Sequence, residues 1–235
     1  PLVNPEGFYM GAKQTIPADG QNLNRMFPGD PAGTFSSRFA KILEKVLYPE
    51  ADFLMDLHGG DINEALTPLI FFPAAVPDTL AAKTSAAAAA LSVPYRVAST
   101  SKNGLYSWAA QCGIPSLLVE RGERGLWSEN EITACKRNVF ELMDHLKIKT
   151  FSNTAFHQEE IRQSIYEETP INGFWYPAVS HAGQKLKQGA LLGTLKDFYG
   201  NEIFRYTAPF DGVILYYTLS LGVKYKDPLI AYGRI

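Results

Sequence analysis

Asp52-Phe53-Leu54-Met55-Asp56-Leu57-His58-Gly59-Gly60 is a short, mostly apolar run that ends on a histidine and two glycines. Its length and its boundaries predict an inner strand of an α/β sheet, covered on both faces. Ligands in open α/β sheets collect at the carboxyl ends of the strands, which is where His58 stands. This imidazole is either a ligand at that end of the sheet or a structural residue; taken alone, the structural interpretation is the commoner one.

A second buried strand is predicted at residues 116–120, and it also ends on an ionisable residue, Glu120. Apolar spacing and capping residues predict four helices and one further short strand. These elements are helices over residues 34–47, 78–91 and 105–111, a helix opened by the capping box at residues 128–131, and a strand over residues 95–98. Strands that alternate with helices indicate an α/β fold with a mostly parallel (mixed) sheet flanked by helices.

The helix that follows the capping box carries an apolar stripe at helical spacing. We expect this stripe to be the inward face of the helix. Its members are Ile132, Cys135, Val139, Leu142, Met143 and Leu146.

Residues 4–31 are rich in turn-forming residues and predict a long irregular segment, preceded by what reads as the end of a strand at Leu2-Val3. Such a segment inside a compact domain is usually functional or disordered, and its own apolar residues argue against disorder. It contains Asn24 and Arg25. An arginine in an anchored loop is suited to bind a carboxylate with both arms of its guanidinium. The alternative is a surface arginine beside asparagines that serve turns.

The composition changes after about Lys149. Residues 151–169 are polar and predict a linker or an edge segment, and short strands separated by glycine turns follow from Pro170. The sequence therefore predicts an α/β domain over residues 1–150 and a small, barrel-like all-β domain over residues 165–235.

The overall composition is that of an ordinary globular protein, with 235 residues, 46% hydrophobic, 20% charged and a net charge of -2. The absence of a basic block argues against binding to nucleic acid. No run is long enough for a membrane span, so we expect no membrane partner. Two cysteines do not make a disulfide framework, and with no visible signal peptide a cytoplasmic location is expected.

Two strands that end on His58 and Glu120, with a loop that offers Asn24 and Arg25, indicate a metal-dependent amide hydrolase. In such a site a metal polarises water, and a carboxylate takes the proton and returns it to the leaving amine. The arginine would hold a carboxylate of the substrate.

The chain resembles the succinylglutamate desuccinylase/aspartoacylase family, a branch of the zinc carboxypeptidase-like hydrolases. The resemblance runs through the α/β part and continues into the β part at residues 208–214. The matching motifs are Asn4-Pro5, residues 19–29 (Asp-Gly-Gln-Asn-Leu-Asn-Arg-Met-Phe-Pro-Gly), residues 56–60, and Gly113-Ile114-Pro115 through Val119-Glu120. It implies a zinc carboxypeptidase-like catalytic domain at residues 1–150, incomplete at its N-terminus, that cleaves an amide bond of a small N-acyl amino acid or peptide-like substrate.

Position by position, the resemblance implies roles for five residues. His58 corresponds to the third zinc ligand and Glu120 to the general base and acid. Asn24 and Arg25 correspond to the pair that binds the substrate carboxylate. Lys13 stands roughly where the family often has an arginine that polarises the scissile carbonyl; lysine keeps the charge but lacks the two-armed geometry.

The expected cofactor is one zinc ion, but the family's first two ligands come from a His-x-x-Glu motif upstream of Asn-Pro. We expect those two ligands in sequence that precedes Pro1, and we expect this chain by itself to bind zinc poorly or not at all. His157-Gln158-Glu159-Glu160 spells the same motif but lies in the polar segment, so we expect it to be solvated.

Several other residues are open to two interpretations. Asp56 either supports a metal ligand or satisfies backbone amides. Arg121, Glu123 and Arg124 either line the mouth of a pocket or, as we expect, are surface charges. The whole chain is either the hydrolase described above or a non-catalytic binding or scaffold remnant of the fold that has lost the metal site. A strand left with an exposed edge would also favour pairing with another chain, so a homo-oligomer is a further expectation.

Overall fold

The computed structural model describes residues 2–12, 14–152 and 156–235. Its chain divides into two compact units, each assembled from three separate segments. Unit 1 consists of Pro1–Leu57, Phe71–Ala90 and Ser99–Val119, and unit 2 of His58–Ile70, Leu91–Ala98 and Glu120–Ile235. The predicted domains at residues 1–150 and 165–235 stay a prediction.

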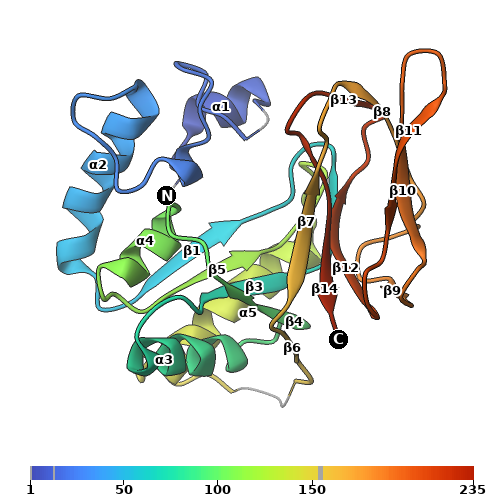
Figure 1. The fold of residues 1–235 in the computed structure, drawn as a ribbon. Helices are drawn as coiled ribbons and strands as arrows, with labels where there is room; N and C mark the ends of the chain where they lie inside the picture. The colour runs from blue at the N-terminus through green and yellow to red at the C-terminus, as the bar shows by residue number, and fades with distance from the viewer. Residues whose placement is uncertain (1, 13, 153–155) are drawn as a thin grey trace. The chain divides into compact units, whose positions relative to one another are not determined.

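A five-stranded sheet with the order β1-β5-β3-β4-β6 carries the two predicted site strands next to one another (Figure 1). Its last pair, β4 and β6, is parallel. The chain has the α/β fold with flanking helices that the sequence predicts. The strands are β1 (Leu54–His58), β3 (Leu69–Pro73), β4 (Tyr95–Ser99), β5 (Ser116–Glu120) and β6 (Glu159–Ile161).

The position of β1 differs from the prediction. Among the described residues it is the terminal strand of the sheet, and Leu57 is 50% exposed. The expectation of an inner strand covered on both faces is therefore wrong for the described part of the chain. The prediction rested on the apolar content of the run, but Met55 and Leu57 lie in a strand for which the described residues provide a hydrogen-bonded neighbour on one side only.

The four predicted helices are present, with boundaries close to those expected. They are α2 (Phe35–Leu47), α3 (Asp78–Ala89), α4 (Leu105–Gln111) and α5 (Glu129–His145). Thr34 caps α2 by accepting a hydrogen bond from the Ser37 N–H. Ser128 caps α5 in the same way, through the Glu131 N–H.

The inward face of α5 was predicted only in part. Ile132 is 37% exposed, whereas Asn138 and Glu141 are buried beside Leu142. Polar side chains therefore occupy inward positions that an apolar stripe does not reveal.

The N-terminal segment is more regular than predicted. Residues Leu2 and Val3 lie outside any strand, and a short helix, α1 (Pro5–Met10), begins directly after Asn4. The Asn4 side chain accepts a hydrogen bond from the Gly7 N–H, and Gly11 ends the helix in the left-handed conformation with φ 60°. Two single turns, η1 (Leu23–Arg25) and η2 (Tyr48–Glu50), follow.

The core of unit 1 packs α4 onto β1 and β5. Its buried members are Tyr48, Leu54, Tyr106, Ala109 and Leu118. Tyr48 also donates a hydrogen bond from its hydroxyl to the Leu105 carbonyl at 2.6 Å, and burial raises the pKa of that hydroxyl.

Two antiparallel sheets form most of unit 2 and pack face to face around one apolar core (Figure 1). One has the order β11-β10-β8-β13 and the other β2-β12-β14-β7, with β9 paired to β12. Trp175 is 1% exposed in this core and donates from its indole nitrogen to the Thr218 carbonyl. The strands are β2 (Glu64–Leu66), β7 (Ser164–Glu168), β8 (Gly173–Pro177), β9 (Lys185–Leu186), β10 (Leu191–Lys196), β11 (Glu202–Thr207), β12 (Gly212–Thr218), β13 (Gly222–Val223) and β14 (Pro228–Arg234).

The β2 strand comes from the segment between β1 and β3, yet it pairs with β12 through Leu66 opposite Tyr216. The small all-β part of the molecule is thus completed by residues from the α/β region. This link brings the turn that precedes β3 next to the β strands of unit 2.

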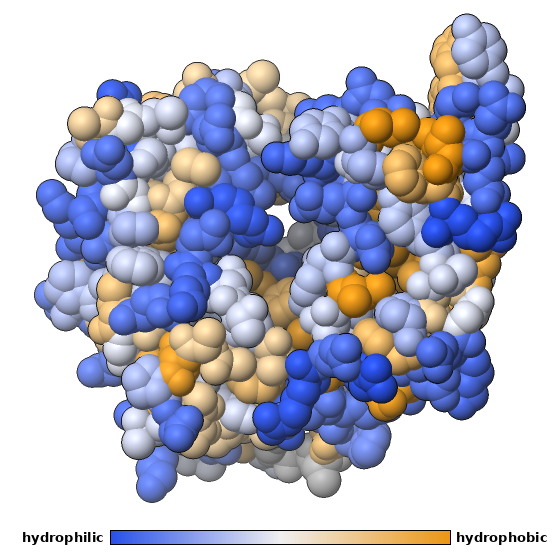
Figure 2. Space-filling model, viewed as in Figure 1, coloured by the Kyte–Doolittle hydropathy of each residue, from blue (hydrophilic) through white to orange (hydrophobic). Residues whose placement is uncertain are grey.

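Polar residues prevail on the face of the molecule shown in Figure 2, and apolar residues form small separate groups among them. In the part of the chain that the structure describes, every helix is too short or too polar to cross a membrane. Cys112 and Cys135 are both free thiols.

Candidate functional site

The structure places His58 and Glu120 side by side. The Leu54 N–H donates to the Pro115 carbonyl and the Arg121 N–H donates to the His58 carbonyl, each at 2.9 Å, so β1 and β5 run in the same direction. Their last residues therefore meet, with 3.7 Å between His58 Nδ1 and Glu120 Oε1. The Glu120 side chain is 15% exposed and that of His58 is 31% exposed. We refer to these two residues as the strand-end pair.

The two glycines after His58 keep the ends of β1 and β5 close together. The Gly60 N–H donates to the Gly122 carbonyl at 2.9 Å. A Cβ atom on Gly59 would lie 2.6 Å from the Arg121 carbonyl oxygen, which is closer than real contacts allow. Glycine at 59 is therefore required by this close approach between the two segments.

Asn24 and Arg25 lie in unit 1, in the single turn η1. The Asn24 side-chain oxygen accepts a hydrogen bond from the Leu105 N–H at 2.8 Å and so caps α4 from a distant part of the chain. Arg25 is exposed and donates from Nη1 to the Asn24 carbonyl at 2.9 Å. Their role in binding a carboxylate stays a prediction, and Lys13 lies outside the described residues.

Asp19 fastens the same loop to the start of α2. Its two carboxylate oxygens accept hydrogen bonds from the Ser36 N–H and the Ser36 hydroxyl, each at 2.7 Å. Desolvation acts to raise the pKa of Asp19, but these hydrogen bonds and one from the Gln21 N–H outweigh it and lower the pKa to about 2. The loop that carries Arg25 is thus held at two points. Asp19 binds the first turn of α2, and Asn24 binds the first residue of α4.

A pocket of about 690 Å³ lies within unit 2, and its lining includes Gly122, two residues after Glu120. Neither His58 nor Glu120 lines it. Glu123 and Arg124 do; they form an ion pair, and Glu123 Oε2 accepts a hydrogen bond from the Leu66 N–H at 3.0 Å. Both residues thus line a pocket, and Arg124, with its side chain 50% exposed, is also the surface charge that we expected. The remaining lining residues are Ala65, Leu66, Thr67, Pro68, Gly122, Leu126, Trp127, Ser128, Glu131, Ser180, His181, Ala182, Tyr217 and Leu219.

Arg121 is not the surface charge that we expected. Its side chain is 11% exposed and forms an ion pair with Glu131 across 3.2 Å. Nε donates to the Asn138 side-chain oxygen at 2.6 Å. The sequence signal for this burial is the position of Arg121 directly after the fully buried run of β5, together with Asn138 within the apolar stripe of α5.

The described residues do not by themselves make a catalytic zinc site. Such a site takes three protein ligands, and the strand-end pair supplies one imidazole and one carboxylate. Among residues 2–12, 14–152 and 156–235, no group of three or more His, Cys, Asp or Glu side chains lies together in a way that could hold a metal ion. His157 is exposed, and the carboxylate of Glu160, three residues later in the sequence, accepts a hydrogen bond from Arg96 Nε at 2.9 Å.

The strand-end pair can carry out proton transfer. A carboxylate that is largely shielded from solvent can accept a proton from a water molecule and later deliver it to a leaving group. The adjacent imidazole can orient that water or bind a cation, because either ring nitrogen can be a donor, an acceptor or a ligand. This chemistry suits hydrolysis of a polar bond.

A family model, described as the succinylglutamate desuccinylase/aspartoacylase catalytic domain, matches residues 1–146. A curated relative, the N-alpha-acetyl-L-2,4-diaminobutyric acid deacetylase of Halomonas elongata, is 43% identical over 60 residues. That match covers 26% of this chain and 17% of the relative, so it concerns only a small part of that enzyme.

Solved structures match almost the whole chain. The product-bound ectoine utilization protein EutE (DoeB) from Ruegeria pomeroyi has a TM-score of 0.81 at 23% identity, over 94% of this chain and 70% of that one. A succinylglutamate desuccinylase/aspartoacylase from Rhodobacter sphaeroides has a TM-score of 0.79 at 25% identity, again over 94% of this chain and 70% of that one. The shared architecture thus extends from the α/β region into the β strands that follow it.

Proposed function

The chain belongs to the succinylglutamate desuccinylase/aspartoacylase family, and from this premise we propose that it is a zinc-dependent amide hydrolase of N-acyl amino acids. The family contains deacylases and desuccinylases that act on small N-acyl amino acid substrates. The proposed reaction splits the amide of such a substrate, or of a peptide-like one, into a carboxylic acid and an amine. The substrate carries a carboxylate next to the scissile bond.

The observation that carries the proposal is the contact between His58 and Glu120 at the carboxyl ends of two neighbouring parallel strands. Glu120 accepts the proton of the attacking water and passes it to the nitrogen of the leaving amine. The carboxylate is restored at the end of the cycle, so protons balance. The side chain of Glu120 is 15% exposed, which keeps it shielded from bulk water.

Arg25 and Asn24 are proposed to bind the substrate carboxylate. The Arg25 guanidinium is exposed, while Asn24 holds the turn that carries it on the start of α4. A guanidinium presents donors that match the two oxygens of a carboxylate. Lys13, which lies outside the described residues, is proposed to polarise the scissile carbonyl.

Zinc is proposed as the cofactor, with His58 as one of its ligands. A zinc ion bound in such a site lowers the pKa of its water. Two further ligands are needed that the described residues do not provide. The zinc content of the full-length protein, measured by metal analysis for wild type and His58→Ala, tests this part of the proposal; equal zinc in both proteins would contradict it.

The activity itself is tested with the full-length protein and a panel of N-acetyl and N-succinyl amino acids, with the released amine measured directly. We expect the protein to hydrolyse at least one of these N-acyl amino acids. This hydrolysis should be lost when the carboxylate of that substrate is converted to an amide. The rival proposal, a non-catalytic binding or scaffold protein of the same fold, predicts binding without turnover throughout the panel.

We also propose a cytoplasmic location, which the free thiols of Cys112 and Cys135 support. Self-association is proposed through β1, which is the terminal strand of its sheet among the described residues, since an edge strand that stays unpaired can pair with another chain. Light scattering of the full-length protein tests the second point, and a monodisperse monomer would contradict it.

A further inference from the structure

We infer that Arg121 is a positioning residue, which fixes the end of β5 through a polar network centred on the buried Asn138 and Glu141 so that Glu120 stays against His58. The inference rests on the proposed role of Glu120 in proton transfer. The network comprises Arg121, Ser92, Glu131, Asn138 and Glu141, all of which belong to unit 2.

The Arg121 guanidinium is held in three directions. Nε donates to the Asn138 side-chain oxygen at 2.6 Å, Nη1 to Glu131 Oε2 at 3.2 Å, and Nη2 to the Ser92 carbonyl at 3.3 Å. Each of the three partners lies on α5 or in the short segment before β4. A planar guanidinium bound on three sides cannot rotate away without breaking several hydrogen bonds.

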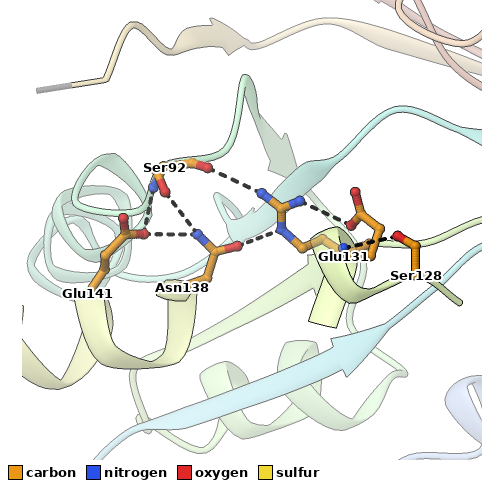
Figure 3. A network of polar contacts seen from close by, with 6 residues as sticks. Ser92, Ser128, Glu131, Asn138 and Glu141 are labelled. Atoms are coloured by element: carbon orange, nitrogen blue, oxygen red, sulfur yellow. Dashed lines mark hydrogen bonds and ion pairs between the residues drawn. The ribbon is translucent and has the colours of Figure 1, made fainter. Parts of the chain in front are cut away.

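A second layer of contacts holds these partners in turn (Figure 3). Asn138 is 0% exposed, and its amide nitrogen donates to Glu141 Oε2 at 2.8 Å. The same Glu141 oxygen accepts from the Ser92 N–H at 2.7 Å. In Figure 3 the side chains of Asn138 and Glu141 extend from α5 toward Ser92. Hydrogen bonds in such a dry environment are stronger than at the surface, and unpaired groups there are costly.

The composition of this face of α5 favours a positional role. Apolar residues at 138 and 141 would extend the inward stripe formed around Leu142, yet the helix buries an amide and a carboxylate there. Buried ionic networks add little net stability compared with apolar packing of the same volume. We infer that this network is retained because it defines one geometry for Arg121.

That geometry is transmitted to the strand-end pair through the backbone. Glu120 is the last residue of β5, and Arg121 follows it directly in the chain. The Arg121 N–H also donates to the His58 carbonyl. Arg121 is therefore linked to both members of the strand-end pair. Its backbone N–H is hydrogen-bonded to the His58 carbonyl, and a peptide bond joins it to Glu120.

The test uses the full-length protein and an N-acyl amino acid that the wild type hydrolyses. In Arg121→Ala we expect kcat to fall about 10- to 100-fold, because a displacement of about 1 Å at a reacting group has an effect of this size. KM should change less than about threefold, since the variant leaves the groups that hold the substrate in place. Arg121→Lys should recover only part of kcat, and added guanidinium ion should raise kcat of Arg121→Ala several-fold.

Arg137→Ala is the matched control, because Arg137 is an exposed arginine on α5, next to Asn138. It should keep the wild-type kcat. A folded Arg121→Ala protein with wild-type kcat, or one that guanidinium ion does not rescue, would overturn the inference.

A second measurement separates this inference from the proposed function. Hydrogen exchange of the backbone amides at positions 121 and 60 reports the pairing between the strand ends, whether or not the protein is active. We expect faster exchange in Arg121→Ala and Asn138→Leu, and wild-type exchange in Arg137→Ala. Wild-type exchange rates in Arg121→Ala and Asn138→Leu would overturn the positioning role of Arg121. If exchange changes in these variants but the wild type hydrolyses no substrate, only the hydrolase proposal is overturned.

Discussion

At the scale of single residues, the environment of each charged group decides what it can do. Glu120 and Arg121 are neighbours at the end of β5, with side chains 15% and 11% exposed. Glu120 lies 3.7 Å from an imidazole, and Arg121 is bound by an amide, a carboxylate and a carbonyl. The surroundings of Glu120 suit a carboxylate that exchanges a proton. Those of Arg121 suit a guanidinium that is fixed in one position.

The Asp19 carboxylate gives a prediction for stability as a function of pH. Its pKa is lowered to about 2 because hydrogen bonds from Ser36 outweigh desolvation, so the unfolded chain binds a proton here more readily than the folded one. The stabilisation is therefore complete above the unfolded pKa and is lost as the pH falls through the folded pKa.

We expect Asp19→Asn to lower the free energy of unfolding at neutral pH, and the difference from wild type to shrink between about pH 4 and pH 2. Urea unfolding at a series of pH values measures it. Asp52→Asn, at an exposed aspartate before β1, is the control. A difference that stays constant down to pH 2 would show that the hydrogen bonds do not depend on the charge of Asp19.

The Asn24 side chain gives a second prediction at this scale. Because it caps α4 through the Leu105 N–H, Asn24→Ala should lower the free energy of unfolding by about 1 kcal/mol. Chemical denaturation measures this, with Asn130→Ala at an exposed position of α5 as the control. If Asn24 also binds the substrate carboxylate, KM will rise in Asn24→Ala. An unchanged free energy of unfolding in this variant would exclude the capping role.

At the scale of elements, local patterns predicted most of the helices and strands. The apolar spacing around Thr34 and the capping residue Ser128 located α2 and α5, and the apolar run before Glu120 located β5. α1 was missed because a helix of six residues in a turn-rich segment has too few positions for a periodic pattern. It depends on Asn4 at one end and on Gly11 at the other.

The inward positions of α5 could not be read from apolar residues. Asn138 and Glu141 are buried because Arg121 and Ser92 provide partners, and those partners come from distant positions in the sequence. The periodic pattern shows where apolar residues lie on one helix. It does not show which polar side chains of that helix will find hydrogen-bond partners on another segment.

The two strand ends give a prediction at the same scale. In Gly59→Ala the new Cβ would lie 2.6 Å from the Arg121 carbonyl oxygen, so the ends of β1 and β5 must separate. We expect kcat of the full-length enzyme to fall at least about tenfold, because His58 and Glu120 move apart. Gly222→Ala is the control, since a Cβ there meets no atom within 4 Å. Equal kcat in Gly59→Ala and wild type would mean that the spacing of the strand ends does not matter.

At the scale of the whole molecule, the path of the chain could not be predicted from local pattern. The β2 strand leaves the segment between β1 and β3 to pair with β12, and Asn63 donates from its side chain to the Ser220 hydroxyl at 2.7 Å. Asn63 and Ser220 are 157 positions apart in the sequence. The order of the strands in the sheet, in which β1 is the terminal strand among the described residues, likewise depends on contacts between distant parts of the chain.

This exchange of strands predicts the behaviour of a fragment. A protein that ends at residue 150 loses β12, which pairs with β2, and β6, which pairs with β4. We therefore expect the fragment 1–150 to lack a cooperative urea transition under conditions in which the 235-residue chain unfolds cooperatively. Circular dichroism measures both proteins. A cooperative transition in the fragment would show that residues 1–150 form an independent domain, as the composition suggests.

Steady-state hydrolysis of an N-acyl amino acid by the full-length Glu120→Gln variant tests most directly whether this carboxylate moves the proton. Glutamine keeps the shape of the side chain and its place 3.7 Å from His58 but cannot accept a proton. We predict that kcat falls by about 100- to 10,000-fold while KM changes little. A Glu120→Gln protein that turns over its substrate at the wild-type rate would contradict the proposed mechanism.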